Sequence, residues 1–222
     1  MEKRFNSGYN RDIFFQPKKF RWHDTQGRQL TAGGVLPYDD NGIWVICEKK
    51  KSAYEYSDMG GKYHFEDGDI YCTMAREFCE ELYHSVSLSR KDIIELSKTN
   101  EINYVHGYNS VPVYASLIVH TNDLEKIGVK MSPELFLTRR KQVLAQNPHV
   151  PEEYYSSVEL LYIEFKDIQK HLNHSEDGDN IIPIGNRLKR MLRYSFLYDK
   201  IKKLNTEEDE FCNQTKSKLI LV

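Results

Sequence analysis

Residues 60–81 read GGKYHFEDGDIYCTMAREFCEE, and this stretch decides the fold of the 222-residue chain. A glycine pair leads through an acidic loop into a segment whose apolar residues recur every four positions, as they do on the buried side of a helix. Glu77, Glu80 and Glu81 are spaced three and four residues apart, so they share one face of that helix. Because carboxylates repel one another there, a bound divalent cation is the natural reason to hold them together.

The ends and sides of this helix can be predicted from the same residues. Asp69 is a good N-cap, and Ile70, Met74 and Phe78 form the buried side. Arg76 can pair with Glu80 four residues on or reach back to the acidic loop, which would hold the carboxylates in place. Hard oxygen ligands suit Mg²⁺ or Mn²⁺ and do not suit zinc. The plainer alternative is a charged helix face that is simply solvated.

This stretch resembles the Nudix box, in which a glycine, five residues and a glutamate are followed by seven residues and Arg-Glu-apolar-x-Glu-Glu-x-Gly-apolar. Here Gly61 is followed by five residues and Asp67, an aspartate in place of the glutamate. Eight residues, one more than in the pattern, separate Asp67 from Arg76. Tyr83 stands at the position of the closing glycine. The Arg-Glu-x-x-Glu-Glu core is intact, and in the family this core carries the metal chemistry.

The flanking segments extend the resemblance over roughly Leu30 to Leu197. Segments 31–38, 42–48 and 158–165 resemble core strands of the family. The resemblance implies an α+β protein with the Nudix fold, a mixed β-sheet sandwiched between α-helices. It divides the chain into a basic and aromatic N-terminal arm (1–29), a Nudix domain (30–204) and a C-terminal tail (205–222).

The implied activity is divalent-metal-dependent hydrolysis of a nucleoside diphosphate linked to another moiety, by cleavage of its pyrophosphate bond. The resemblance implies Mg²⁺ or Mn²⁺ as cofactor, bound by the Gly61 carbonyl and the carboxylates of Glu77, Glu80 and Glu81. It also implies catalytic roles for Glu77 and Glu81, an orienting role for Arg76, and a further glutamate on a later loop. The candidates for that glutamate are Glu134, Glu152, Glu153 and Glu159. Glu152 and Glu153 are favoured because they precede the last core strand, and Glu153 is the residue chosen.

Two other functions are consistent with the same residues. The altered box favours a Nudix-fold nucleotide-binding or sensor module without significant turnover. A solvated acidic helix in an unrelated α/β protein is the other alternative.

The sequence leaves the substrate open. Relatives hydrolyse nucleotide sugars, ADP-ribose, dinucleoside polyphosphates, diphosphoinositol phosphates or capped RNA. The basic arm and the cluster Arg139-Arg140-Lys141 favour a highly phosphorylated substrate or RNA, although packed or solvated surface is the commoner role of such residues. A homodimer is expected by analogy alone.

Composition agrees with a soluble domain. Hydrophobic residues make up 40% of the chain and charged residues 29%, and the net charge of −2 gives no sign of a nucleic-acid-binding protein. No segment has the length of a membrane span or the apolar core of a signal peptide. The four cysteines, Cys47, Cys72, Cys79 and Cys212, lack metal-binding spacing, so reduced thiols and a cytoplasmic location are expected.

The remaining elements follow from turn and capping signals. The sequence predicts a hairpin turn at Asp39–Gly42, a short helix over 90–98 and a strand pair over 102–120. It also predicts a helix over 133–146 capped by Ser132, and a short helix or turn over 166–173. The period of apolar residues predicts one long amphipathic helix over 184–204, with Arg187 on its outer face.

Overall fold

The computed structural model describes residues 30–50, 53–106, 113–150, 155–172 and 182–203. The N-terminal arm, the C-terminal tail, Cys212 and the candidates Glu152 and Glu153 lie outside these ranges. Within them, Cys47, Cys72 and Cys79 are free thiols. No helix of the described ranges is long and apolar enough to cross a membrane.

The first two strands form the predicted hairpin. β1 (Leu30–Tyr38) and β2 (Gly42–Lys50) are antiparallel and pair at Tyr38 and Ile43, beside the turn. The Asp39 carboxylate closes this turn by accepting hydrogen bonds from the backbone N–H groups of Asn41 and Gly42, at 2.8 and 2.9 Å. An aspartate at this position of a tight turn commonly bonds its own backbone in this way.

Seven strands build one mixed sheet. The remaining strands are β3 (Ala53–Ser57), β4 (Met59–Lys62), β5 (Glu101–His106), β6 (Val113–His120) and β7 (Ser157–Glu164). The order is β3-β2-β1-β6-β5, with β4 pairing on β1 and β7 on β2. The β1–β6 pair is parallel and the other strand pairs are antiparallel, so the sheet is mixed.

β1 and β2 separate away from their turn, and the β3–β4 segment enters between them. β3 pairs with the C-terminal half of β2, from Ile46 to Lys50, whereas β4 pairs with β1 at positions that include Gly60 and Gly61. Asp58 is the single residue between the two strands, and its side chain is fully buried. The segment that begins the box is therefore fixed to the centre of the sheet.

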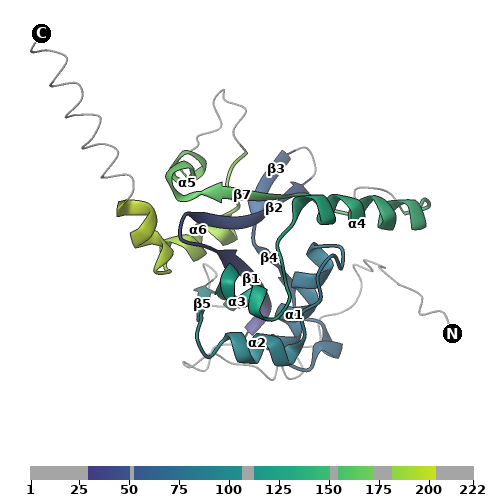
Figure 1. Ribbon diagram of the computed structural model, residues 1–222, viewed down its shortest axis with the longest axis horizontal. Coiled ribbons are helices and arrows are strands. Elements are labelled where there is room, and N and C mark those ends of the chain that lie inside the picture. Colours follow the sequence, from purple (N-terminus) through teal and green to yellow (C-terminus); the bar gives the residue numbers. More distant parts are fainter. Residues whose placement is uncertain (1–29, 51–52, 107–112, 151–154, 173–181, 204–222) are drawn as a thin grey trace, which may run out of the picture.

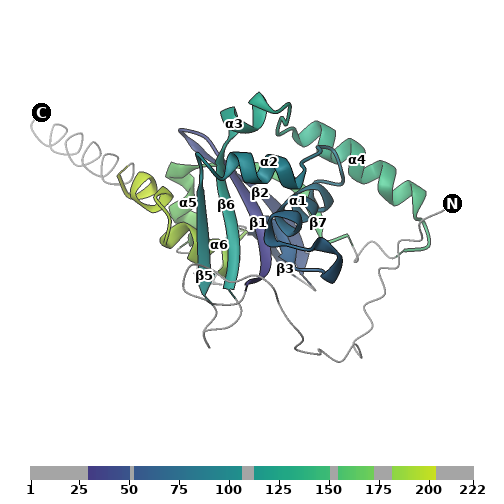
Figure 2. The ribbon, with the colours of Figure 1, turned by 90° about the horizontal axis from the view of Figure 1, so that it is seen from below.

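Helices cover both faces of this sheet (Figure 2). One face carries α1 (Ile70–Glu81) and α2 (Arg90–Leu96), and α3 (Thr121–Lys126) and α4 (Pro133–Gln146) pack into the same core. The other face carries α5 (Phe165–Leu172) and α6 (Asn186–Arg193). Phe78 and Phe136 are buried on the first side, Phe165 and Leu188 on the second. The expected α+β class and the mixed sheet sandwiched between helices are confirmed, an arrangement consistent with the Nudix fold (Figure 1).

Most of the predicted local elements are also confirmed. Ser89 caps α2 and Ser132 caps α4, each by accepting a hydrogen bond from a backbone N–H of the first turn. β5 and β6 are the predicted strand pair, β7 begins one residue before its predicted start, and α5 is the predicted short helix. On α1, the Asp69 side chain accepts from the Cys72 N–H, as an N-cap residue does.

The single long helix predicted over 184–204 is wrong. Ile184 forms a β-bridge with Tyr56, and Gly185 N donates to Tyr56 O at 2.8 Å, so this part of the chain extends along β3. α6 then ends at Arg193, and residues 197–203 form a separate helical turn. The Asn103 side chain binds the Tyr194 carbonyl at 2.9 Å where the helix breaks. These hydrogen bonds between distant segments therefore decide the local structure, although the spacing of apolar residues favours one continuous helix.

Candidate functional site

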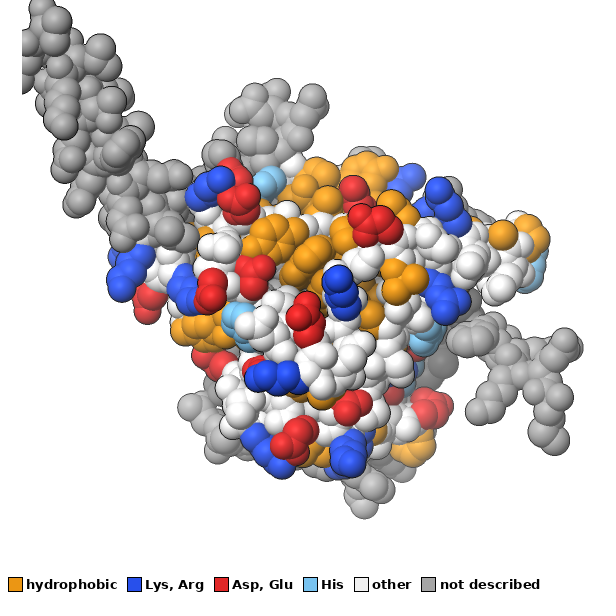
Figure 3. All heavy atoms as spheres, in the orientation of Figure 1, with side chains coloured by type: hydrophobic (Ala, Val, Ile, Leu, Met, Phe, Trp, Pro, Cys, Tyr) orange, Lys and Arg blue, Asp and Glu red, His pale blue; other side chains and the backbone are white. Residues whose placement is uncertain are grey.

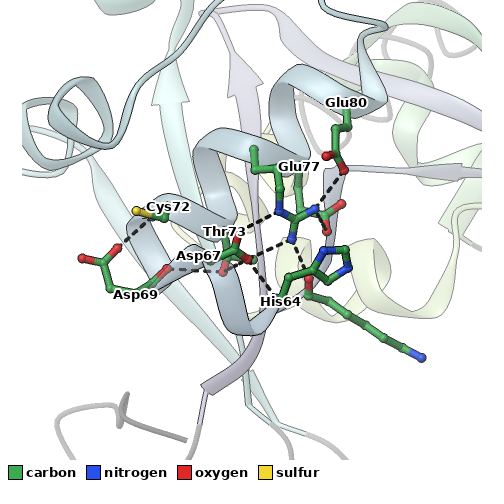
Figure 4. A network of polar contacts seen from close by, with 9 residues as sticks. His64, Asp67, Asp69, Cys72, Thr73, Glu77 and Glu80 are labelled. Atoms are coloured by element: carbon green, nitrogen blue, oxygen red, sulfur yellow. Dashed lines mark hydrogen bonds and ion pairs between the residues drawn. The ribbon is translucent and has the colours of Figure 1, made fainter. Parts of the chain in front are cut away.

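Arg76 is the centre of a polar network that joins Asp67, Glu77 and Glu80, the carboxylates labelled in Figure 4. Its Nε and Nη2 donate to the two carboxylate oxygens of Asp67 at 2.7 and 2.9 Å, and Nη2 also donates to the Lys62 carbonyl at 2.8 Å. Its Nη1 lies 2.8 Å from oxygens of both Glu77 and Glu80. The two pairings predicted for Arg76, with Glu80 and with the acidic loop, are therefore both present.

Asp67 binds the loop before α1 to the helix, although its side chain is shorter than the glutamate of the family pattern. Asp67 ends a short 3₁₀ turn, Phe65–Asp67, and besides Arg76 its carboxylate accepts from His64 N and the Thr73 hydroxyl, each at 2.9 Å. Burial acts to raise the pKa of Asp67, but these donors, Arg76 first, hold it below its usual range. The loop thus closes onto α1 with one residue more than the family pattern has.

Gly60 and Gly61 leave room for the side chains of Tyr114 and Glu77 because they have no Cβ atom. A Cβ on Gly61 would lie 2.3 Å from a carboxylate oxygen of Glu77, and a Cβ on Gly60 would lie 1.9 Å from the Tyr114 hydroxyl. The Gly61 backbone therefore packs directly against the Glu77 carboxylate. Burial and the nearby carboxylates Glu80 and Asp67 raise the pKa of Glu77 to about 7, although Arg76 opposes this.

Glu81 faces a cavity of about 170 Å³ at the end of α1. The cavity is lined by Glu77, Glu80, Glu81, Tyr83, Tyr155, Ser156 and Ser157. The Ser157 hydroxyl donates to Glu81 Oε2. Burial, followed by the charges of Glu48 and Glu77, raises the pKa of Glu81 to about 8, while Ser157 and Arg187 act to lower it. The cavity thus combines three box glutamates with an excess of negative charge.

The box glutamates differ in how freely they could bind a cation. Glu80 is the most exposed and is paired with Arg76, Glu77 is buried and also paired with Arg76, and Glu81 is bonded to Ser157. Over the described part of the chain, no three His, Cys, Asp or Glu side chains are already gathered as a metal site. The donor set still fits a hard cation, because it consists of carboxylate oxygens.

Glu48 is a further buried carboxylate at the site, and it is not among the candidates that the sequence predicts. Its side chain at the end of β2 is 8% exposed and its Oε2 lies 3.0 Å from Lys50 Nζ. After burial, its charge contributes most to the raised pKa of Glu81. The sequence could have indicated this position, because residues two apart in a strand lie on the same face of the sheet. Glu48 lies two residues after Ile46, whose side chain packs in the core beneath α1.

Behind these carboxylates, Arg187 forms an ion pair with Asp58, in which Asp58 is fully buried and Arg187 is half-buried. Arg187 Nε donates to Asp58 Oδ1 at 2.8 Å, and the Tyr114 hydroxyl donates to Asp58 Oδ2 at 2.5 Å. Arg187 Nη2 donates to the Ser57 hydroxyl at 2.7 Å. The predicted outward position of Arg187 is therefore wrong. Because the chain before α6 is bound to β3, the first turn of α6 directs Arg187 under the sheet junction at Asp58.

The other predicted candidates lie apart from the box. Glu134 is at the exposed start of α4, where it accepts from Ser132, and Glu159 lies opposite Cys47 on the β2–β7 pair. The favoured Glu153 lies outside the described residues and stays a prediction. In the basic cluster, Arg140 turns inward and Nε donates to the Ser157 carbonyl at 3.1 Å, whereas Arg139 and Lys141 are exposed.

Comparison with known proteins adds a distant structural similarity. No protein-family model matches the chain, and no curated protein matches its sequence. Among solved structures, the chain is similar to a binary complex of an Ap4A hydrolase from C. elegans, with a TM-score of 0.35 and 11% identity. The match covers 82% of this chain and 98% of that chain. The functional interpretation therefore rests on the residues of the site.

Proposed function

We propose that this chain is a Nudix-type hydrolase that cleaves the pyrophosphate bond of a nucleoside diphosphate linked to another moiety, with Mg²⁺ or Mn²⁺ as cofactor. One observation carries the proposal. The box glutamates Glu77 and Glu81 converge on one cavity with raised pKa values, next to the Gly61 backbone. Among the described residues, Arg76 is the one cation paired with Glu77 and Glu80, so the positive charge beside the three box glutamates is smaller than their own negative charge, and a bound cation would supply the rest.

Glu77, Glu80 and Glu81, with the Gly61 carbonyl, are the groups that would hold the cation. When bound, a divalent cation would supply positive charge against the diphosphate oxygens and lower the pKa of water. Arg76 keeps the glutamates in one orientation through its bonds to Asp67, Glu77 and Glu80. Ser157 engages Oε2 of Glu81, so Oε1 is the atom available to accept a proton or to bind the cation. These contacts of the chain's own residues support the proposed roles.

A small nucleotide derivative is the substrate class that we favour over capped RNA. On the face in Figure 3, Lys and Arg side chains alternate with Asp and Glu, and hydrophobic side chains gather over the region of β2 and β7. A protein that follows a nucleic-acid backbone instead presents clustered positive charge. Of the basic cluster on α4, Arg140 is already bonded to the protein, which leaves fewer cations for a long polyanion.

The proposal is tested with a hydrolysis panel and product analysis. The full chain is incubated with Mg²⁺ or Mn²⁺ and with a nucleotide sugar, ADP-ribose, a dinucleoside polyphosphate, a diphosphoinositol phosphate and capped RNA. We expect cleavage of a phosphate anhydride in at least one small nucleotide, which EDTA abolishes. Binding without cleavage across the panel would instead support the sensor module, for which the pairing of Arg76 with two box glutamates is the favouring observation.

Stability in the absence of metal should fall as pH rises. Glu77 and Glu81 have folded-state pKa values of about 7 and about 8, above the value of 4.5 for an unperturbed glutamate. Their stabilising contribution is complete below the unfolded-state pKa and is lost as pH rises through the folded-state values. We therefore expect the melting temperature in EDTA to fall by about 5 °C or more between about pH 5 and about pH 9.

Divalent cation should reverse this loss at high pH, because it neutralises the same carboxylates. Scanning calorimetry in EDTA and in Mg²⁺, at matched ionic strength, measures both effects. A melting temperature in EDTA that is flat across this range, together with no response to Mg²⁺, would contradict the metal assignment.

A further inference from the structure

The residue at the position of the closing glycine is a tyrosine with a left-handed backbone conformation. Tyr83 has φ 52° and the next residue, His84, has φ 53°, both in the left-handed region that glycine adopts readily. Bulky residues adopt it only where the surrounding structure imposes it, and such residues are enriched at functional sites. The turn that ends α1 thus carries an aromatic side chain in a conformation that glycine adopts more readily.

The contacts of Tyr83 explain how the turn is held. The residue is 7% exposed, and its ring packs edge-on against Phe136 of α4 with centroids 5.3 Å apart. Its hydroxyl donates to the Ser157 carbonyl at 2.6 Å, across 74 residues of sequence. A glycine could make neither contact. The side chain thus joins the end of the box helix to α4 and to the first residue of β7.

Ser157 transmits these contacts to Glu81. Its carbonyl accepts from the Tyr83 hydroxyl and from Arg140 Nε, while its hydroxyl donates to Glu81 Oε2. Ser157 is itself only 3% exposed, and the same residue lines the cavity of the box glutamates. Two donors, Tyr83 from the turn after α1 and Arg140 from α4, thus fix the backbone of the residue whose side chain binds Glu81.

We infer that Tyr83, Arg140 and Ser157 are positioning residues of the proposed hydrolytic site, in which Tyr83 and Arg140 hold Ser157 so that it orients the Glu81 carboxylate. The inference rests on the proposed function and deepens it. In this chain the closing glycine of the box is replaced by a side chain that acts on the last box glutamate through a strand far away in sequence. A tyrosine that merely filled space would need only its ring.

The test is a double-mutant cycle on Tyr83 and Ser157. Tyr83→Phe keeps the ring and its packing and removes only the hydroxyl, and Ser157→Ala removes the bond to Glu81. Mn²⁺ affinity is measured by electron paramagnetic resonance, and kcat and KM with the best substrate of the panel. We expect each single variant to lose about 10-fold in Mn²⁺ affinity and in kcat, with KM changed less, the usual cost of losing a partner of a metal ligand.

The double variant carries the sharpest prediction. If Tyr83 acts through Ser157, Tyr83→Phe should have almost no further effect once Ser157 is alanine, and Ser157→Thr, which retains a hydroxyl, should recover most of the affinity. Tyr198→Phe, on the opposite side of the sheet, serves as the control for loss of a tyrosine hydroxyl. Melting temperatures of all variants show whether each is folded. If Tyr83→Phe does not fold, the comparison of Ser157→Ala with Ser157→Thr still tests whether the Ser157 hydroxyl orients Glu81.

Two results would overturn the inference. Tyr83→Phe could match the wild type in Mn²⁺ affinity and kcat, or its effect could add fully to that of Ser157→Ala. Failure of the proposed function would look different, because the wild-type chain itself would then neither bind Mn²⁺ nor cleave any substrate.

Discussion

Replacing Glu81 by glutamine is expected to lower kcat by about 10²- to 10⁴-fold, the range for removal of an acid–base group. Glutamine keeps the size of the side chain and can still accept the hydrogen bond from Ser157, but it has no charge for a cation and cannot take a proton. In the absence of metal, the variant should also be more stable than the wild type at about pH 9, because the buried charge is gone. Steady-state kinetics and thermal unfolding measure the two effects.

Glu125→Gln is the matched control for this substitution. Glu125 is an exposed glutamate on α3, so its loss of charge should leave both kcat and stability nearly unchanged. If Glu81→Gln retained wild-type kcat while the wild type hydrolysed its substrate, Glu81 would have no part in the chemistry.

Replacing Arg187 by alanine is expected to lower the free energy of unfolding by about 3 kcal/mol, the lower end of the cost of removing one partner from a buried ion pair, because the Arg187 side chain is 31% exposed. The Asp58 carboxylate is fully buried and would lose the guanidinium that bonds its Oδ1. Burial works against the charge of Arg187, yet Asp58 beside it raises the pKa of the guanidinium above its ordinary value. Urea unfolding followed by circular dichroism measures the change.

Arg193→Ala provides the comparison within the same helix. Arg193 is exposed at the end of α6, and its removal should change the free energy of unfolding by about 0.5 kcal/mol or less. Equal effects of the two substitutions would mean that the Arg187–Asp58 pair does not hold the junction between β3 and β4.

The parts of the fold that the sequence predicts well are those set by local signals. Ser132 before Pro133 marks the start of α4, and Asp39 with Gly42 marks the hairpin turn, because capping and turn residues act within a few positions. The box core is predictable for the same reason, since the spacing of Glu77, Glu80 and Glu81 alone places them on one helix face.

The parts that escape prediction depend on contacts between distant segments. The bridge of Ile184 to Tyr56 and the bond from Asn103 to Tyr194 divide a periodic segment that would otherwise favour one helix. Ser157 reaches Glu81 across 76 residues, so no pattern near either residue indicates it. Tyr83 is an intermediate case, because its place at the closing glycine is visible in the sequence but the use of its hydroxyl is not.

The central claim is that the box carboxylates support cleavage of a phosphate anhydride, and isotope transfer from water tests it most directly. The metal-depleted wild-type chain is given Mg²⁺ and the small nucleotides of the panel in H₂¹⁸O, and the products are examined by ³¹P NMR and mass spectrometry. The account predicts that ¹⁸O enters a product phosphate only when Mg²⁺ is present, and that Glu81→Gln reduces this incorporation by at least about 10²-fold. Nucleotides that are bound but remain intact and unlabelled, with Mg²⁺ present, would contradict it.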